Sequence, residues 1–475
     1  MAVMTLADWL GHAERQHTVG IDLGLERVTR VAGALGFTGP DFRPAPRCLI
    51  IAGTNGKGST TVFSEALLRA RGLRVGATVS PHLHRFNERV RLDGIPVEDA
   101  LLCRAFAAVE AARGAVPLTY FEYSALVALW VFRDAAVDVA VLEVGLGGRL
   151  DAFNLVGADV AVVTSIGLDH QEYLGSDVER IGIEKAGVMR PGRDVVIGSD
   201  VTASVRAEAM RLGCRLRAMG ETFAFRQEPD RWHFTGATGT FADLPWGRLA
   251  PYNCAVAIEA VGCLESLTEA HVRSGLDTAE LPGRCESWHI ADRQLLVDVA
   301  HNPAGAAFLR RHVEARFPGR QFVGVLGMLA DKDAAGVVSA FGPRVSRWIC
   351  VPTTGPRGQR AEQLADRVRT ALARAATDRG APTGSTTGTG ASIQPSGLAP
   401  RQQGAGPDQV AMAGDVADGL EAAVAATAPG DGILAFGSFD LVESLRDVLG
   451  AGRLSARLRV RASGGGSASG SALGG

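Results

Sequence analysis

An apolar run that enters a glycine-rich turn and then the start of a helix constrains the fold of this chain more than any other feature. Residues 50–60 have the sequence IIAGTNGKGST. Glycines let backbone N–H groups close around phosphate oxygens, and the N-terminus of the following helix adds a positive dipole. Lys57 would reach the β- and γ-phosphates of a nucleotide, and Ser59 or Thr60 would help to hold Mg²⁺. The motif therefore predicts a nucleotide-binding strand, loop and helix.

The spacing of this motif differs from that of the common P-loop. Two residues separate Gly53 from Gly56, and Gly58 lies between Lys57 and Ser59. A Gly-rich turn without a ligand is the alternative interpretation. The order of strand, lysine, hydroxyl residue and helix favours phosphate binding.

Short β-branched runs alternate with helical patterns along the whole chain. Strands are predicted at 48–52, 75–78, 137–144, 160–165 and 195–198, and then at 294–299, 322–326, 348–351 and 432–436. Helices are predicted at 59–71, 97–113, 123–134, 304–316, 361–376 and 416–427. Alternation of this kind is typical of a parallel sheet with covering helices. The predicted fold class is α/β: a P-loop NTPase-like parallel-sheet domain followed by a smaller Rossmann-like α/β domain.

The length of 475 residues exceeds that of a usual single domain. We expect a nucleotide-binding domain at 1–284 and a second domain at 285–450, joined near the Leu-Pro-Gly-Arg sequence at 281–284. Residues 377–409 are rich in Gly, Thr, Ser, Pro and Gln, which predicts a disordered insertion in a surface loop. Residues 451–475 are predicted to be a flexible Gly/Ser tail.

The charge balance argues against nucleic acid or an anionic membrane as a partner. The chain has 49 basic and 51 acidic residues, a net charge of −2. Its seven cysteines are scattered without metal-binding spacing, which is typical of a reducing compartment. The first 16 residues lack the layout of a signal peptide. We therefore expect a soluble cytoplasmic enzyme that acts on small molecules.

Polar residues follow two of the predicted strands, where ligands bind in open α/β sheets. Glu143 and His170 could therefore converge on a metal ion near the phosphates. The alternative is that each is an ordinary cap or a loop residue that forms hydrogen bonds. His301 follows a strand of the second domain, and it is a further candidate site residue.

These motifs, taken together, resemble folylpolyglutamate synthases, in particular the bifunctional dihydrofolate synthase/folylpolyglutamate synthases of the Mur ligase superfamily. The matching stretches occur in the same order as in the family, at 21–28, 53–59, 80–83, 86–89, 118–122, 143–151, 169–170, 184–187, 281–284, 300–303 and 331–333. They span nearly the whole chain apart from the low-complexity insertion and the tail. One such motif would be a weak signal, whereas an ordered set is specific.

The resemblance implies a set of site residues, and Mur ligase architecture for the two domains. ATP binding is implied for Asn55, Gly56, Lys57, Gly58, Ser59, Asn253, Arg284 and Asp298. Metal binding is implied for Ser80, Glu143 and His170. The family's carbamylated lysine corresponds to Lys185. The pteroate pocket corresponds to Thr119, Tyr120, Phe121, Glu122, Leu150, Asp151 and Ala152. For Tyr120 and Phe121, core packing is an equal alternative to stacking on the substrate.

The activity that the resemblance implies is ATP-dependent addition of L-glutamate to dihydropteroate and to tetrahydrofolate or folylpolyglutamate, through an acyl phosphate. Mg²⁺ and ATP are the expected cofactor and co-substrate, with a monovalent cation as a further candidate, and the expected form is a monomer. Lys57, Lys185, His170 and His301 are the candidate catalytic residues. The chain departs from the family pattern at Phe153 and Val299, which puts substrate preference in question.

Three other functions are alternatives to this one. A monofunctional folylpolyglutamate synthase would use reduced folates alone. A Mur-type peptide ligase would carry an extra domain before the phosphate loop, and about fifty residues are too few for one. A P-loop protein that uses nucleotide as a switch would act without regard to glutamate.

Overall fold

The structure is a computed structural model that describes residues 4–17, 21–37, 39, 41–380, 409–450 and 460–462. The chain forms two compact units, Met1–Pro282 and Gly283–Gly475. The division falls inside the predicted junction at 281–284 and places Arg284 in the second unit. Among the described helices, none is long and apolar enough to cross a membrane.

The first unit contains an eight-stranded sheet with the order β4-β3-β2-β5-β1-β6-β7-β8. Its strands are β1 (Arg47–Ala52), β2 (Val75–Thr78), β3 (Val90–Leu92), β4 (Ile95–Pro96), β5 (Val139–Glu143), β6 (Val160–Val163), β7 (Asp194–Ile197) and β8 (Arg215–Ala218). The six strands from β2 to β8 pair in parallel, as predicted. The antiparallel edge formed by β3 and β4 was not predicted. Asp93 and Gly94, both at positive φ, form the tight turn between these two strands.

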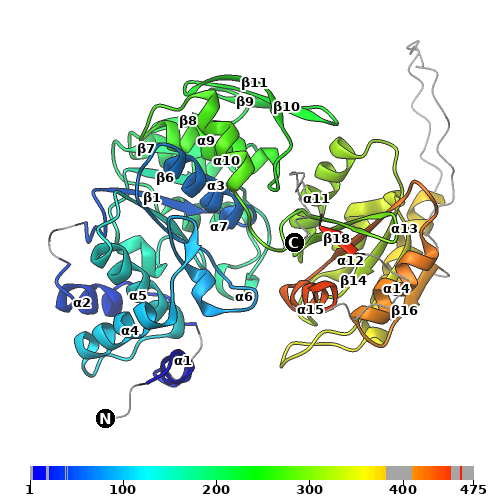
Figure 1. Cartoon of the computed structure of the whole chain (residues 1–475), viewed down its shortest axis with the longest axis horizontal. Coiled ribbons are helices and arrows are strands. Elements are labelled where there is room, and N and C mark those ends of the chain that lie inside the picture. The colour runs from blue at the N-terminus through cyan, green and yellow to red at the C-terminus, as the bar shows by residue number, and fades with distance from the viewer. Residues whose placement is uncertain are drawn as a thin grey trace, which may run out of the picture. The chain divides into compact units, whose positions relative to one another are not determined.

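Two groups of helices cover the faces of this sheet (Figure 1). Its helices are α1 (Leu6–Glu14), α2 (Glu26–Ala34), α3 (Lys57–Ala70), α4 (Asp99–Arg113), α5 (Tyr120–Asp134), α6 (Gln171–Leu174), α7 (Val178–Ala186), α8 (Ala203–Arg211), α9 (Pro251–Gly262) and α10 (Glu269–Thr278), with 3-10 turns η1 (Phe86–Arg89) and η2 (Ala152–Leu155). Helices α3, α9 and α10 lie together on one face, and α1, α2, α4 and α5 lie together on the other. Phe106, Leu126 and Phe132 are fully buried in the core on this second face.

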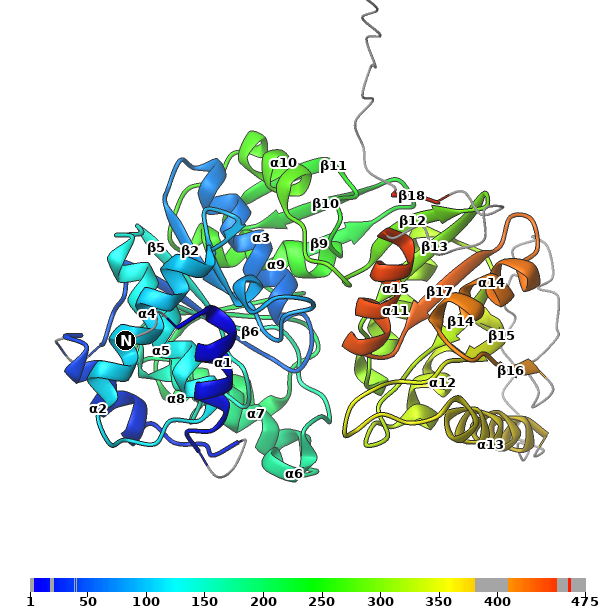
Figure 2. The same ribbon diagram turned by 60° about the horizontal axis from the view of Figure 1, so that its bottom comes forward.

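A small antiparallel sheet beside α9 and α10 completes the first unit (Figure 2). It consists of β9 (Ala224–Gln227), β10 (Arg231–Gly236) and β11 (Gly239–Pro245). Our sequence analysis missed this sheet. Its signal is the alternation in β10, where Trp232 and Phe234 are buried and Arg231 and Thr235 are exposed.

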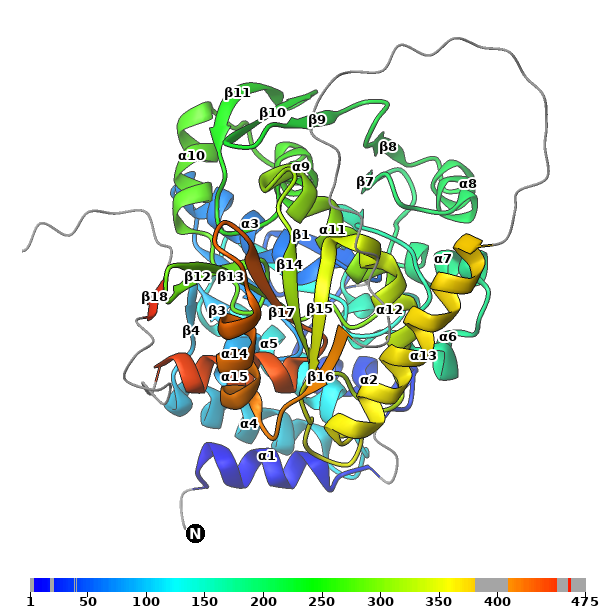
Figure 3. The ribbon, with the colours of Figure 1, turned by 90° about the vertical axis from the view of Figure 1, so that its right-hand side faces the viewer.

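The second unit contains a seven-stranded sheet with the order β16-β15-β14-β17-β13-β12-β18 (Figure 3). Its strands are β12 (Glu286–Ile290), β13 (Arg293–Asp298), β14 (Phe322–Leu326), β15 (Val345–Cys350), β16 (Val410–Met412), β17 (Gly432–Phe436) and β18 (Val460–Ala462). Its helices are α11 (Pro303–Arg316), α12 (Ala334–Phe341), α13 (Ala361–Gly380), α14 (Val416–Ala426) and α15 (Phe439–Gly450), with the 3-10 turn η3 (Gly342–Arg344). The strands from β16 to β13 are parallel, and β12 and β18 extend the sheet in the antiparallel sense.

Composition predicts two segments without regular structure, at 377–409 and 451–475, and the structure shows regular structure in part of each. Helix α13 continues to Gly380, so the first residues of the predicted insertion at 377–409 are helical. Residues 460–462 of the predicted flexible tail form β18, which pairs with β12. Composition cannot reveal this pairing, because the partner strand lies about 170 residues earlier and supplies the edge N–H and C=O groups. Residues 381–408, 451–459 and 463–475 lie outside the described part of the chain.

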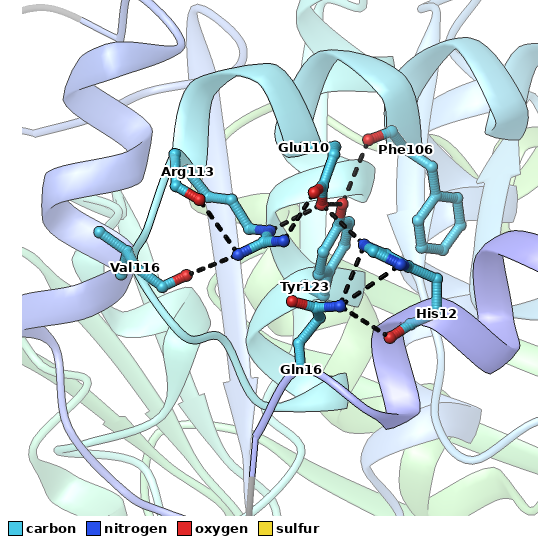
Figure 4. A network of polar contacts seen from close by, with 8 residues as sticks. His12, Gln16, Phe106, Glu110, Arg113, Val116 and Tyr123 are labelled. Atoms are coloured by element: carbon cyan, nitrogen blue, oxygen red, sulfur yellow. Dashed lines mark hydrogen bonds and ion pairs between the residues drawn. The ribbon is translucent and has the colours of Figure 1, made fainter. Parts of the chain in front are cut away.

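A polar network joins α1 to α4 and α5 (Figure 4). The Glu110 carboxylate accepts hydrogen bonds from Arg113 at 2.6 Å and from the Tyr123 hydroxyl at 2.8 Å. It also lies 3.0 Å from Nε2 of His12, and Gln16 contacts the same ring. Partial burial opposes ionisation of Glu110, but the hydrogen bonds outweigh it and lower its pKa to about 2. The network therefore fastens the N-terminal helix to the first unit.

Candidate active site

The loop between β1 and α3 requires glycine at two positions. Gly53 has a φ of 148°, and a Cβ there would lie 1.9 Å from Oγ1 of Thr164. Gly56 has a φ of 86°, and a Cβ there would lie 2.5 Å from Oδ1 of Asn253. Neither position can accept a side chain without displacing a neighbour. The turn therefore forms a narrow cradle of backbone groups, as the phosphate-loop interpretation expects.

Hydroxyl groups at the end of β6 support this loop. Oγ1 of Thr164 donates to the carbonyl of Asn55 at 2.7 Å, and the N–H of Asn55 donates to Oγ of Ser165 at 3.1 Å. The Lys57 ammonium donates to the carbonyls of Gly53 at 3.0 Å and Thr54 at 3.3 Å. Thr164 and Ser165 were missed in our sequence analysis. Two hydroxyl residues directly after an apolar strand were the available signal.

Asn253, which belongs to helix α9, lies beside the loop between β1 and α3. It lies in the first turn of α9, and its side chain is buried. Its Oδ1 accepts no hydrogen bond from the described residues and faces Gly56. A buried amide oxygen without a donor is unfavourable unless a ligand or water completes it. The arrangement fits a polar ligand in the cradle.

Glu143 and Ser80 lie together beside the phosphate loop. Glu143 ends β5 and is 3% exposed, and its Oε2 accepts the N–H of Ser80 at 2.9 Å. A Cβ on Gly58 would lie 3.4 Å from the same oxygen, so the loop approaches the carboxylate closely. A carboxylate and a hydroxyl residue at this place are hard oxygen donors that suit a divalent cation. Among the described residues, no group of three His, Cys, Asp or Glu side chains forms a metal cluster, so a cation here would need ligands from outside that set, such as Ser80 or phosphate oxygens.

A pocket brings the other candidate residues to the loop. It is lined by Gly53, Thr54, Lys57, Val144, Gly145, Leu146, Gly147, Asp169, His170, Leu174 and Lys185. His170 has a φ of 49°, a left-handed conformation that is uncommon for a residue with a side chain and is often found at functional sites. Segments separated by about 130 residues thus contribute to one site.

Lys185 is buried in α7, where the chain after β5 packs closely against it. A Cβ on Gly148 would lie 2.6 Å from the carbonyl oxygen of Glu184, to which the N–H of Arg149 donates at 2.7 Å. Burial, with a smaller effect from the charge of Lys57, lowers the pKa of Lys185 to about 7. Burial thus favours the neutral amine of Lys185 over its ammonium form.

The residues expected to bind pteroate begin at the N-terminus of α5. Thr119 and Glu122 form a capping box, in which the carboxylate accepts the N–H of Thr119 at 2.8 Å. The ring of Tyr120 lies 5.6 Å from the Arg89 guanidinium. The ring of Phe121 lies 5.8 Å from that of Phe153, edge to face, so Phe121 is partly committed to internal packing.

The second stretch expected to bind pteroate consists of residues 150–152. Of these, Leu150 lines a cavity of about 520 Å³. The cavity is bounded by Leu23, Arg149, Leu150, Tyr173, Leu174, Gly175, Arg180, Ile183 and Glu184. Asp151 and Ala152 are buried instead, and the Asp151 carboxylate accepts the N–H groups of Gly145 and Leu146 at 2.9 and 3.0 Å. The shared residue Leu174 makes this cavity a neighbour of the pocket that contains Lys57 and Lys185.

Three expected residues lie together in the second unit. The Asp298 carboxylate ends β13 and accepts the N–H groups of Cys285 at 2.9 Å and Ala300 at 2.8 Å. The Arg284 guanidinium lies 5.1 Å from the centre of the Phe439 ring, and the His301 ring lies 6.5 Å from the same centre. This edge of the second sheet therefore carries a cation, a carboxylate and an imidazole.

Comparisons with known proteins identify the family. The Mur ligase middle domain matches residues 51–221, and the Mur ligase glutamate ligase domain matches residues 283–439. The dihydrofolate synthase/folylpolyglutamate synthase of Escherichia coli (strain K12) is 44% identical over 366 residues, which are 76% of this chain and 85% of the relative. The chain belongs to the dihydrofolate synthase/folylpolyglutamate synthase family of Mur ligases. This ligase is an ATP-dependent enzyme, as the motifs predicted.

Solved structures agree with that assignment. E. coli FolC in complex with DHPP and ADP has a TM-score of 0.81 and 37% identity to this ligase, and covers 95% of this chain and 99% of its own. A bifunctional folylpolyglutamate synthase/dihydrofolate synthase with Mn, AMPPNP and L-glutamate bound has a TM-score of 0.77 and 37% identity, over 96% of this chain and 99% of its own. The predicted family, fold class and reaction class are confirmed.

Proposed function

We propose that this ligase uses ATP to join L-glutamate to dihydropteroate, forming dihydrofolate, and to tetrahydrofolate or folylpolyglutamate. The observation that carries the proposal is the single pocket that unites the phosphate loop with Lys57, His170 and Lys185. The adjoining cavity, with Leu23 and Leu150 in its wall, provides room for the acceptor. Relatives with both activities in their names support the choice of substrates.

The chemical problem is that a carboxylate has no good leaving group. A carboxylate oxygen of the acceptor attacks the γ-phosphorus of ATP, the bond to ADP breaks, and an acyl phosphate forms. The amine of glutamate then attacks the acyl carbon, loses a proton, and expels phosphate as the amide forms. Exclusion of water matters here, because water would hydrolyse the acyl phosphate.

The protein contributes mainly position and charge in this scheme. Lys57 and the N–H groups of the loop stabilise charge on the transferred phosphoryl group, as fixed donors do in other phosphoryl transfers. Correct placement of two reactants can lower a barrier by about 7–11 kcal/mol. We assign ATP contacts to Asn55, Gly56, Lys57, Gly58, Ser59, Asn253, Arg284 and Asp298, and pteroate contacts to Thr119, Tyr120, Phe121, Glu122 and Leu150. Asp151 and Ala152, which the resemblance also implies, are buried and do not line the cavity, so we assign them to the support of Leu150. His301 is assigned to orienting glutamate or the nucleotide.

Mg²⁺ is the cation that we assign to Ser80, Glu143 and His170. It would neutralise phosphate charge and polarise the γ-phosphoryl group. The buried Glu143 carboxylate beside Ser80 and the phosphate loop supports this assignment. A monovalent cation is a further candidate without an assigned site. A monomeric, cytoplasmic enzyme without nucleic-acid or membrane partners fits the near-neutral charge of −2.

We assign a carbamate to Lys185. The neutral amine attacks the carbon of CO₂, the nitrogen loses a proton, and an anionic carbamate results. Its position in the pocket of Lys57 and its lowered pKa of about 7 both favour this modification. A carbamate would replace a buried cation by an anion beside Lys57, and could orient the metal or the phosphate.

The test of the function is phosphate release from Mg-ATP with L-glutamate, measured with dihydropteroate or tetrahydrofolate in parallel. Release that requires glutamate and responds to both acceptors is the expected result. A response to tetrahydrofolate alone would make the enzyme a monofunctional folylpolyglutamate synthase. Phosphate release that depends on neither glutamate nor an acceptor would contradict the ligase function.

A further inference from the structure

Arg27 joins two segments that are far apart in the sequence. Its Nε donates to both carboxylate oxygens of Glu122 at 3.1 and 3.2 Å. Its two terminal nitrogens donate to the carboxylate and to the backbone carbonyl of Asp22, each at 2.7 Å. One guanidinium in the first turn of α2 thus binds the preceding loop and the start of α5 at once.

The Glu122 end of this bridge is rigid. The Glu122 side chain is 5% exposed and also accepts the N–H of Thr119, so it is fixed in the capping box of α5. A planar guanidinium holds a carboxylate with defined geometry, which an ammonium cannot do. The bridge therefore fixes the segment that contains Asp22 relative to the start of α5.

The Asp22 end is a segment that makes no helix or strand of its own. Residues 21–25 have irregular backbone, and Leu23 lines the cavity of about 520 Å³ together with Leu150. Arg27 captures the carbonyl of Asp22, which is the residue next to Leu23. The segment has no secondary structure, so side-chain contacts hold it at the cavity: the Arg27 bridge, the His17 ring 3.3 Å from the Asp22 carboxylate, and the packing of Leu25 on the core.

We infer that Arg27 is a positioning residue for the acceptor: it holds residues 21–25 as one wall of the acceptor cavity without touching the substrate. The inference rests on the proposed function, since the cavity is taken to hold dihydropteroate or tetrahydrofolate. A wall that is ordered in advance spares the acceptor the entropy of ordering it. Loss of the bridge therefore weakens acceptor binding and leaves ATP binding intact.

The experiment compares Arg27→Ala and Arg27→Lys with the wild-type enzyme, measuring KM for each substrate and kcat. We expect Arg27→Ala to raise KM for both acceptors by about tenfold or more, with KM for ATP changed by less than about twofold. Arg27→Lys keeps the charge but loses the fork, so a smaller rise in the acceptor KM is expected. If Arg27→Ala is insoluble, the acceptor KM of Arg27→Lys tests the inference.

Arg113→Ala is the matched control. Arg113 is also an arginine with a paired glutamate in the first unit, in the network of Figure 4, and it makes no contact with residues 21–25. It should lower the melting temperature without moving the acceptor KM. An acceptor KM that changes equally in the Arg27 variants and in the control, or that stays at the wild-type value in the Arg27 variants, would overturn the inference. A wild-type enzyme without acceptor-dependent phosphate release would instead refute the proposed function.

Discussion

Replacement of Lys57 by alanine is expected to lower kcat with either acceptor by about 10²–10³-fold. The Lys57 ammonium lies over the phosphate loop, held by the carbonyls of Gly53 and Thr54. In the proposed mechanism this charge stabilises the negative charge that the transferred phosphoryl group gains, and no other residue of the loop at 53–59 is positively charged. The measurement is steady-state phosphate release at saturating glutamate and acceptor, over a range of ATP concentrations.

Ser64→Ala is the control for this prediction. Ser64 lies two turns further along α3, fully buried, and its hydroxyl has no hydrogen-bond partner among the described residues. Its removal should leave kcat unchanged and stability equal or slightly higher. A Lys57→Ala enzyme within about threefold of wild type in both kcat and KM for ATP would remove Lys57 from the phosphate site.

Replacement of Lys185 by alanine is expected to reduce kcat by about 10²–10³-fold, and a short carboxylic acid should restore part of the loss. The alanine leaves a hole in the pocket that Lys57 shares, and acetate or formate can place a carboxylate there. The carbamate that we assign to Lys185 is such an anion. The measurement is kcat with increasing acetate, at constant ionic strength.

The rescue by acetate should be specific to Lys185. Chloride should not restore activity to Lys185→Ala, and acetate should not restore activity to Lys57→Ala, which loses a cation and not an anion. The intact mass of the wild-type protein, kept in bicarbonate buffer, should show the addition of one CO₂ that is absent from Lys185→Ala. Full activity of Lys185→Ala without any added acid would contradict the assignment.

Local signals predicted the centre of each sheet well. The strand 48–52 and the following loop were recognisable because an apolar run, glycines and a hydroxyl residue are adjacent in the sequence. The antiparallel sheet β9 to β11 was missed, although Trp232 and Phe234 alternate with exposed residues. Strand β18 could not be found, because its stability depends on β12, which is distant in the sequence.

Local patterns predicted some residues of the candidate site, and other residues of the site left no local signal. Lys57, Glu143 and His170 follow predicted strands, so their common edge of the sheet could be inferred from the residues. Asn253 and Lys185 lie on helices with no local mark of function, and the family resemblance alone suggested them. The Arg27 bridge was not foreseen, because an arginine that joins residues 5 and 95 positions away leaves no periodic pattern.

The central claim is that the acceptor carboxylate is activated as an acyl phosphate, and isotope transfer tests it most directly. Dihydropteroate with ¹⁸O in its carboxylate would be incubated with the enzyme, Mg-ATP and L-glutamate, and the released phosphate would be analysed by mass spectrometry. The account predicts one ¹⁸O atom in each phosphate, because the carboxylate oxygen that attacks the γ-phosphorus leaves with it. Phosphate without ¹⁸O, released while dihydrofolate forms, would contradict the account.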